Sequence, residues 1–486
     1  MKKLLIVSIL IFLPAMNVSA QQIASGRLIS LGGLSTAVST DVDAIGTNPA
    51  NLVSLSQGSV VIELAPIGIT AGTDFFTLGL YDDYFTGQTD IEGNTIGTYL
   101  TDSDKQKIID AFPNGAGTVR ANVNVRAFAL AIRGPDYGIG FSVDDKVGAQ
   151  VTIPGSFASL VLNGFTWGTL SSWNDLASRS FWYRSYSVEY GMKLPAGMFP
   201  IPSQIGKDFE VGIGFKYVTG FSYSFIQSTN TSFYADSTNH TYIVNMGFNA
   251  LRAGLISNVI SKSAKSTVGD TVVKFDPFKP QGTGLGIDIG ATARILNFIK
   301  VGISLTDIGS ITWSKNLERT AGDTSVSFGG FSPAETNVAG SKSNLDSLNN
   351  VFKDYFKNRD ITTSSFSTAL PTKLNIGASI KLEELSSSIP GQLLVAVDYH
   401  QGFTDTYDNS KVAEFIIGAE WNPIYVLPVR TAIGLGGLYG FRWSLGFGFD
   451  FPFWDLDLGI GTFNTFVSPL SAKNVSVVLS ILKFRF

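Results

Sequence analysis

Few residues in this chain could carry out acid–base or nucleophilic chemistry. The 486 residues include two histidines, His240 and His400, and no cysteine. His400 shares one face of an expected strand with Asp398, because side chains two residues apart in a strand point the same way. A hydrolase would also need a nucleophile in contact with a base, and no particular serine suits that role. We therefore interpret Asp398 and His400 as polar side chains that line an interior.

Metal and cofactor sites are equally unsupported by the sequence. Asp41 and Asp43, followed by Gly46, resemble the start of a calcium loop, but its twelfth position is Leu52 and not the required glutamate. Residues 33–37 (GLSTA) lack the second glycine of a nucleophile elbow. We expect no enzyme activity, no cofactor and no metal site.

The composition indicates a membrane protein built from strands. Charged residues make up 15% of the chain, below the ~25% that is usual in soluble domains. No internal run of about 18 apolar residues exists, which excludes helical membrane spans. The formal net charge of −4 gives no sign of nucleic-acid binding.

Many segments alternate between bulky apolar residues and glycine, serine or charge. Residues 209–217 (FEVGIGFKY) are a clear example. Charges on one face of strand after strand, and strands long enough for a tilted span, favour lipid over a second sheet as the partner of the apolar face. The pattern predicts an all-β fold, a transmembrane antiparallel barrel of about 14 strands. The polar side chains predicted to face its lumen include Glu210, Lys216, Asp288, Arg294, Lys373, Asp398, His400 and Glu420.

The N-terminus has the features of a secretory signal peptide over residues 1–20. Lys2 and Lys3 precede a short apolar run, and residues 18–20 (VSA) form a small-residue cleavage site. We expect cleavage after Ala20. Residues 21–57 follow; their part from Gly26 on is rich in small residues, does not alternate and contains the turn Asn48-Pro49-Ala50.

This beginning resembles a known group of proteins. Residues 43–50 (DAIGTNPA), after a small-residue segment and a signal peptide, are similar to the start of the FadL-like long-chain fatty-acid transporters and of the PorV-type barrels of the Bacteroidota. The nearest likeness is to an uncharacterised subfamily of these outer-membrane barrels. The resemblance implies that residues 21–57 form a plug in the barrel, with Asn48, Pro49 and Ala50 as its motif. Arg27, Asp41, Asp43 and Asn48 could then bond to the charged lumen.

The rest of the chain, residues 58–486, is predicted to form the barrel. Two polar stretches, about 228–280 and 314–367, are expected to be long extracellular loops, with short helices near 250–261 and 345–356. Another short helix is expected over 102–112, capped by Ser103. Trp182, Trp421, Trp443 and Trp454 are expected to mark the membrane edges.

Two functions follow from the resemblance. The first is passive transport of a hydrophobic small molecule through a plugged barrel in the bacterial outer membrane. The alternative is a PorV-like structural or secretion-associated barrel that binds protein partners through its outer loops and transports nothing. In either case we expect outer-membrane lipids and the barrel-assembly machinery as partners, and no nucleic acid.

The last strand, residues 473–486, should close the barrel against a first strand near residues 59–65. Val478, Leu482, Phe484 and Phe486 are predicted to share its apolar face. The resemblance implies that Phe484 and the terminal Phe486 are read by the assembly machinery.

Deleting Phe486 should therefore lower the amount of barrel in the outer membrane much more than it lowers the stability of the folded protein. Quantitative blotting of outer-membrane fractions, beside thermal unfolding of refolded protein, tests this. Normal outer-membrane levels of the deletion variant would refute the assembly role.

Overall fold

Antiparallel strands make up most of the protein. The computed structural model describes residues 25–54, 59–89, 91–195, 197–198, 206–254, 279–295, 298–329, 361–386, 388–404, 409–437 and 440–486. Within these ranges, no helix combines the length and the apolar character needed to cross a membrane.

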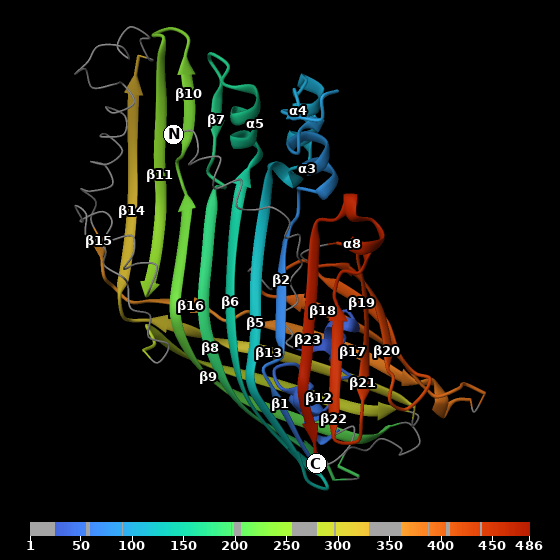
Figure 1. Ribbon diagram of the computed structural model, residues 1–486. Coiled ribbons are helices and arrows are strands. Elements are labelled where there is room, and N and C mark those ends of the chain that lie inside the picture. The colour runs from blue at the N-terminus through green and yellow to red at the C-terminus, as the bar shows by residue number, and fades with distance from the viewer. Residues whose placement is uncertain are drawn as a thin grey trace.

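One sheet closes on itself as a barrel (Figure 1). Each wall strand pairs antiparallel with both neighbours, and the last strand pairs with the first. We count β1 and β2 as one wall strand, and β16 and β17 as another. On this count, 14 strands close the barrel in the described part of the chain. This confirms the predicted fold. In order around the wall they are β1 (Val60–Leu64) with β2 (Ile67–Thr73), β5 (Ala116–Arg133), β6 (Tyr137–Pro154), β8 (Ala177–Lys193), β9 (Gly206–Ser228), β12 (Gly282–Ile295), β13 (Ile299–Trp313), β16 (Phe366–Ala369) with β17 (Lys373–Lys381), β18 (Gln392–Gly402), β19 (Glu414–Asn422), β20 (Val429–Gly436), β21 (Arg442–Asp450), β22 (Trp454–Ile460) and β23 (Asn474–Arg485).

The seam of the barrel joins the last strand to the first. Val61 of β1 lies opposite Arg485 of β23, which confirms the pairing expected from the sequence. β1 and β2 are two parts of one wall strand, since both pair with β23 and with β5. Ala65, with a φ of 49°, and Pro66 interrupt it, because neither can continue the ladder in that conformation.

A bulge in β23 corrects one prediction about this strand. Between its pairs with Asp457 and Asp455, the register of β23 on β22 shifts by one residue. Val478 is therefore fully buried inside the barrel, whereas Leu482 and Phe486 are exposed on the outside. The predicted shared face was wrong for Val478, because an extra residue reverses the alternation beyond it.

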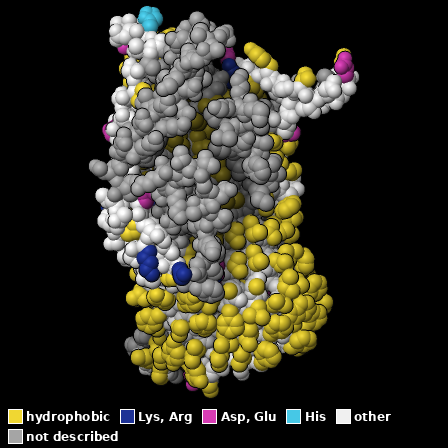
Figure 2. All heavy atoms as spheres, turned by 60° about the vertical axis from the view of Figure 1, so that its left-hand side comes forward, with side chains coloured by type: hydrophobic (Ala, Val, Ile, Leu, Met, Phe, Trp, Pro, Cys, Tyr) yellow, Lys and Arg dark blue, Asp and Glu magenta, His cyan; other side chains and the backbone are white. Residues whose placement is uncertain are grey.

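The outer wall is apolar. Figure 2 shows a band of hydrophobic side chains around the lower half of one face. Trp421 and Trp454 sit at the lower end, where Trp421 Nε1 donates to Pro390 O (3.0 Å) and Trp454 Nε1 to Ile481 O (2.6 Å). Trp182 and Trp443 lie in the upper parts of β8 and β21. A closed barrel with an apolar belt between aromatic residues is the arrangement of an outer-membrane-type transmembrane barrel.

One side of the wall rises far above the rest (Figure 1). There β9 pairs with β11 (Thr241–Gly254), which pairs with β14 (Leu317–Phe328) and β10 (Ser232–Asp236); the short strands β7 (Leu170–Ser172) and β15 (Ile361–Thr362) flank them. Parts of the two predicted long loops are therefore strand. Above the membrane neither face of a strand must be apolar, so the polar sequence of β14 carried no alternation signal.

The predicted helices fare differently. The helix near 250–261 is wrong where it overlaps β11, and the one over 345–356 lies outside the described residues. α4 (Asp102–Asp110) is present, but its N-cap is Thr101 and not Ser103: Thr101 Oγ1 accepts Asp104 N at 3.3 Å. The other short elements are α3 (Leu78–Phe85), β3 (Gln88–Thr89), β4 (Thr95–Ile96), η3 (Pro113–Gly115), α5 (Gly155–Asn163), η5 (Leu382–Glu384), α8 (Asn464–Val467) and η6 (Pro469–Ser471).

Candidate functional site

The N-terminal segment lies inside the lower half of the barrel, and we call its described residues, 25–54, the plug. Its helix α2 (Gly26–Ser30) packs against β20 to β23. η1 (Asp41–Ala44) packs against β1, β5 and β6, and η2 (Pro49–Val53) against β5, β6, β8, β9 and β12. The plug therefore touches most of the wall's circumference.

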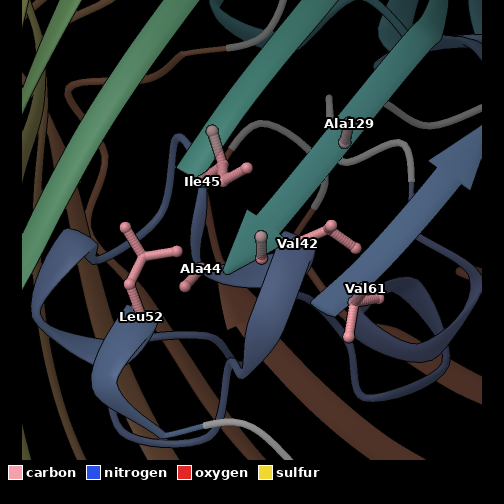
Figure 3. Packing of buried hydrophobic residues seen from close by; sticks show 7 residues of the cluster. Val42, Ala44, Ile45, Leu52, Val61 and Ala129 are labelled. Atoms are coloured by element: carbon pink, nitrogen blue, oxygen red, sulfur yellow. The ribbon is translucent and has the colours of Figure 1, made fainter. Parts of the chain in front are cut away.

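An apolar contact joins the plug to the first strands. Figure 3 shows Val42, Ile45 and Leu52 of the plug next to Val61 of β1 and Ala129 of β5. All five side chains are fully or almost fully buried. This is the one place in the described plug where an apolar cluster includes β1 and β5, so the plug and the seam share a core.

The motif Asn48-Pro49-Ala50 fixes the middle of the plug. Asn48 caps η2, because its Oδ1 accepts Ala50 N at 3.2 Å, and Pro49 occupies the first helical position. Asn48 Nδ2 donates to Thr36 O at 2.8 Å. This one side chain thereby holds two parts of the plug together while it is fully buried.

Glycines on the inner wall receive the plug backbone. An added Cβ at Gly302 would lie 2.6 Å from Thr36 O, and one at Gly191 would lie 2.5 Å from Pro49 O. Contacts this close leave no room for any side chain. Other inward glycines face plug side chains as closely. We call the inward glycines at which an added Cβ would lie within 3.0 Å of a plug atom the glycine seat: Gly138, Gly140, Gly191, Gly212, Gly290, Gly302, Gly377, Gly418, Gly446 and Gly459.

Arg27 anchors one side of the plug. Its guanidinium forms a forked pair with Glu420, with Nε 2.8 Å from Oε2 and Nη2 3.1 Å from Oε1. Glu420 also accepts Arg430 Nε at 2.6 Å, and Arg430 in turn contacts Asp457. Burial acts against the charge on Arg27, but Glu420 outweighs it and holds the pKa of Arg27 above its ordinary value.

Lys483 anchors the opposite part of the plug. Its Nζ lies 2.9 Å from Asp41 and 3.5 Å from Asp43, both nearly fully buried. Burial raises the pKa of Asp43, but Lys483 and then Arg27 outweigh burial and keep it below its ordinary value. Removing one partner of such a buried pair leaves an uncompensated charge, at a cost of about 3–5 kcal/mol.

Asp398 holds a turn of the plug. Its Oδ2 accepts Ser35 N (2.8 Å), Thr36 N (3.0 Å) and Thr36 Oγ1 (2.9 Å). His400 Nε2 lies 3.3 Å from the same oxygen, and its Nδ1 lies 3.8 Å from Glu414. Because the Asp398 carboxylate accepts these amides of the plug, it fixes the position of this turn.

Lys216 and Asp288, two further predicted lumen residues, form a buried ion pair. Lys216 Nζ lies 2.7 Å from Asp288 and 2.5 Å from Asp307. Beside them, Glu189 accepts the plug amide Gly46 N at 2.8 Å. This buried cluster adds another contact between wall and plug.

Of the three remaining predicted lumen residues, Glu210 also meets the plug, because its Oε1 accepts Ser54 Oγ at 3.4 Å. Glu210 lies 3.0 Å from Lys300, and Arg294 lies 3.7 Å from Asp208 near the lower end. Lys373 begins β17 at its upper end, opposite Thr306 of β13.

The plug separates two cavities in the described lumen. Below it lies a polar cavity of about 570 Å³, reached from the lower end and lined by plug residues such as Val38 and Ser54. Above it lies a polar cavity of about 60 Å³, lined by plug residues such as Leu28 and Gly46. Among the described residues, none lines both cavities.

Two apolar features of the wall accompany the plug. Above it, the inner wall carries a buried aromatic and aliphatic cluster: Phe181, Tyr183, Val218, Ala253, Ile311, Trp313 and Leu370. On the outside, a groove of about 800 Å³ runs over β9, β12, β13 and β17 to β20. Its apolar lining includes Ala293, Ile303 and Ala378, and its floor includes Gly302 and Gly377 of the glycine seat.

Several wall residues that hold the plug were not among the predicted lumen residues. Arg126 donates to Val42 O at 2.9 Å, and Arg442 donates to Gly32 O at 2.7 Å. The glycine seat was also missed, although glycine on the polar face of many strands is visible in the sequence. Spacing alone does not tell a glycine that relieves crowding from one that receives another backbone.

Comparison with protein families places most of the chain. Residues 49–455 match the family described as "Family of unknown function (DUF5723)". The chain belongs to this family. No curated protein matches it.

Solved structures that resemble the chain include outer-membrane channels. The toluene transporter TodX of Pseudomonas putida is 12% identical, with a TM-score of 0.43, covering 96% of this chain and 97% of that chain. A FadL homologue of Pseudomonas aeruginosa is 11% identical, with a TM-score of 0.42 and 97% coverage of both chains. The monoaromatic hydrocarbon channel CymD is 14% identical, with a TM-score of 0.41, covering 97% of this chain and 98% of that chain.

Replacing Asp398 with asparagine should loosen the plug. The change removes charge-assisted bonds, each contributing about 1.5–3 kcal/mol, and sets an amide against the Ser35 and Thr36 donors. Influx of a small polar dye into liposomes that contain the folded variant should rise above the wild-type rate.

Asp236→Asn is the matched control, because Asp236 bonds only within its own turn above the wall in the described contacts. Equal dye influx for wild type and Asp398→Asn, at equal amounts of folded barrel, would show that Asp398 does not hold the plug closed.

Proposed function

We propose that this protein lets hydrophobic small molecules cross the outer membrane passively, without an open aqueous pore. One observation carries the proposal. The apolar groove on the outer wall is backed by Gly302 and Gly377, and Thr36 of the plug lies against the inner side of the same two glycines. Only backbone separates bilayer from plug at these two positions.

The inner wall above the plug supports an apolar entry. Phe181, Tyr183 and Trp313 place buried aromatic rings on β8 and β13, so this part of the lumen is apolar. β9 and β13 contribute to this cluster and also to the groove, through Phe209 and Ile303. A hydrophobic solute could therefore stay against one side of the barrel from the upper lumen to the groove.

The downward route suits such a solute poorly. The lower cavity is lined by charged groups, among them Arg294, Lys300 and Glu420. Moving the apolar surface of a solute from the aromatic cluster into this polar cavity costs about 25 cal/mol for each Å² exposed. Exit sideways into the bilayer avoids that cost.

The remaining expectations enter as parts of this proposal. We assign no catalytic role, since Asp398 holds the plug and His400 contacts Asp398 and Glu414. We place the barrel among outer-membrane lipids, with Phe484 and Phe486 as the signal for the assembly machinery and no nucleic acid as partner. Neither the described surfaces nor the comparisons support the secretion-associated alternative.

Filling the groove should slow transport. Ala293→Trp and Ala378→Trp place a large ring in the groove while leaving the lumen and plug contacts unchanged. We expect each variant to reduce uptake of a labelled long-chain fatty acid or of toluene about tenfold, which corresponds to ~1.4 kcal/mol in the barrier. Uptake is measured in cells that lack their own hydrophobic-solute transporters.

Ala121→Trp is the control, because Ala121 is exposed on β5, which is not among the strands that line the groove. If both groove variants take up solute at the wild-type rate, at equal outer-membrane levels, the proposed sideways exit through the groove is wrong. Absence of uptake by the wild-type protein for every hydrophobic probe would remove the transport function itself.

A further inference from the structure

β22 is too short to cross a membrane. It has 7 residues, whereas a tilted strand needs about 9–11. Its neighbours continue past its upper end: β21 extends from Leu445 up to Arg442, and β23 from Val477 up to Asn474. The segment that follows β22, residues 461–472 with α8 and η6, therefore stands beside strands that are still in the wall.

This segment exposes large apolar side chains. Phe466, Val467 and Leu470 are 58%, 61% and 59% exposed. No charged residue occurs in 461–472. A cluster of this kind on an otherwise polar loop marks a surface that contacts an apolar partner.

The exposed side chains continue the apolar outer wall. Trp443 of β21 lies edge-on against Phe463, with ring centroids 5.1 Å apart, and Phe463 lies 6.1 Å from Phe466. The indole of Trp443 is on the exterior, where its Nε1 donates to Thr431 Oγ1 at 2.9 Å. An unbroken row of rings thus leads from the wall to α8.

The backbone of the segment is satisfied internally, as lipid requires. Phe466 N donates to Phe463 O (2.9 Å), Ser468 N to Asn464 O (2.9 Å) and Ala472 N to Pro469 O (3.0 Å). With these amides paired, the segment can lie against lipid.

The segment is also held firmly in place. Asn464 Oδ1 accepts Trp443 N at 3.1 Å, and Thr465 Oγ1 donates to Asn474 O at 2.6 Å. From above, α3 packs on η6, where a Cβ at Gly79 would lie 2.8 Å from Leu470 O. Its exposed apolar side chains therefore face outward at a fixed height.

We propose that α8 and η6 are embedded in the membrane leaflet at the upper end of the barrel. Phe466, Val467 and Leu470 insert at the boundary between headgroups and acyl chains and complete the span that β22 leaves short. The partner of this surface is lipid. Lipid contact here is independent of whether the barrel transports a solute.

The absence of cysteine allows a direct test with the full chain. Val467→Cys, carrying a nitroxide label, is reconstituted in phosphatidylcholine–phosphatidylglycerol vesicles. Collision rates with oxygen, which concentrates in lipid, and with a water-soluble nickel chelate are then measured. Ile303→Cys on the outer wall is the lipid reference, and Ile91→Cys, at a fully exposed position between β3 and β4, is the water reference.

We expect the Val467 label to resemble the Ile303 label, with frequent oxygen and rare nickel collisions. A nickel collision rate like that at Ile91 would overturn lipid insertion. Low rates for both quenchers would also overturn it, because the site would then be covered by protein. If Val467→Cys does not fold, Leu470→Cys gives the same reading.

Discussion

Close contact between two backbones, that of the plug and that of the barrel wall, is the constraint on which the rest of the structure depends. It is possible because the inner wall carries glycine at the points of closest approach, as at Gly302 against Thr36 and Gly191 against Pro49. A methyl group at such a position would force the plug inward and open a gap. Close packing of the two backbones requires both the small residues of the plug and the glycines of the wall.

Charge fixes the position that this fit allows. Arg27 with Glu420, Lys483 with Asp41, and Asp398 with the Ser35 amide hold the plug from different sides of the barrel. Buried ion pairs contribute little net stability compared with apolar packing, but they penalise every position in which a charge loses its partner. The charges of the lumen therefore favour a single position of the plug. An apolar solute loses less free energy of transfer along the apolar wall than in the charged lower lumen.

The sequence predicts the barrel well because lipid imposes a strict alternation, as in residues 209–217. Prediction from the sequence fails where lipid does not impose this alternation. β14 stands above the membrane and has no apolar face, and the bulge in β23 reverses the face of Val478. The lumen residues could be named from alternation, but their partners could not. That Asp398 meets the plug while Lys373 does not depends on where a non-alternating segment settles, which strand periodicity does not record.

The most direct test of this account is the conductance of the purified barrel in planar lipid bilayers, with and without residues 26–57. If the plug closes the lumen by fitting the glycine seat, the full chain should conduct no measurable ion current. The deletion variant, folded to the same extent, should form a steady open pore. Equally low conductance from both proteins, or an open pore in the full chain, would contradict the claim that this segment seals the barrel.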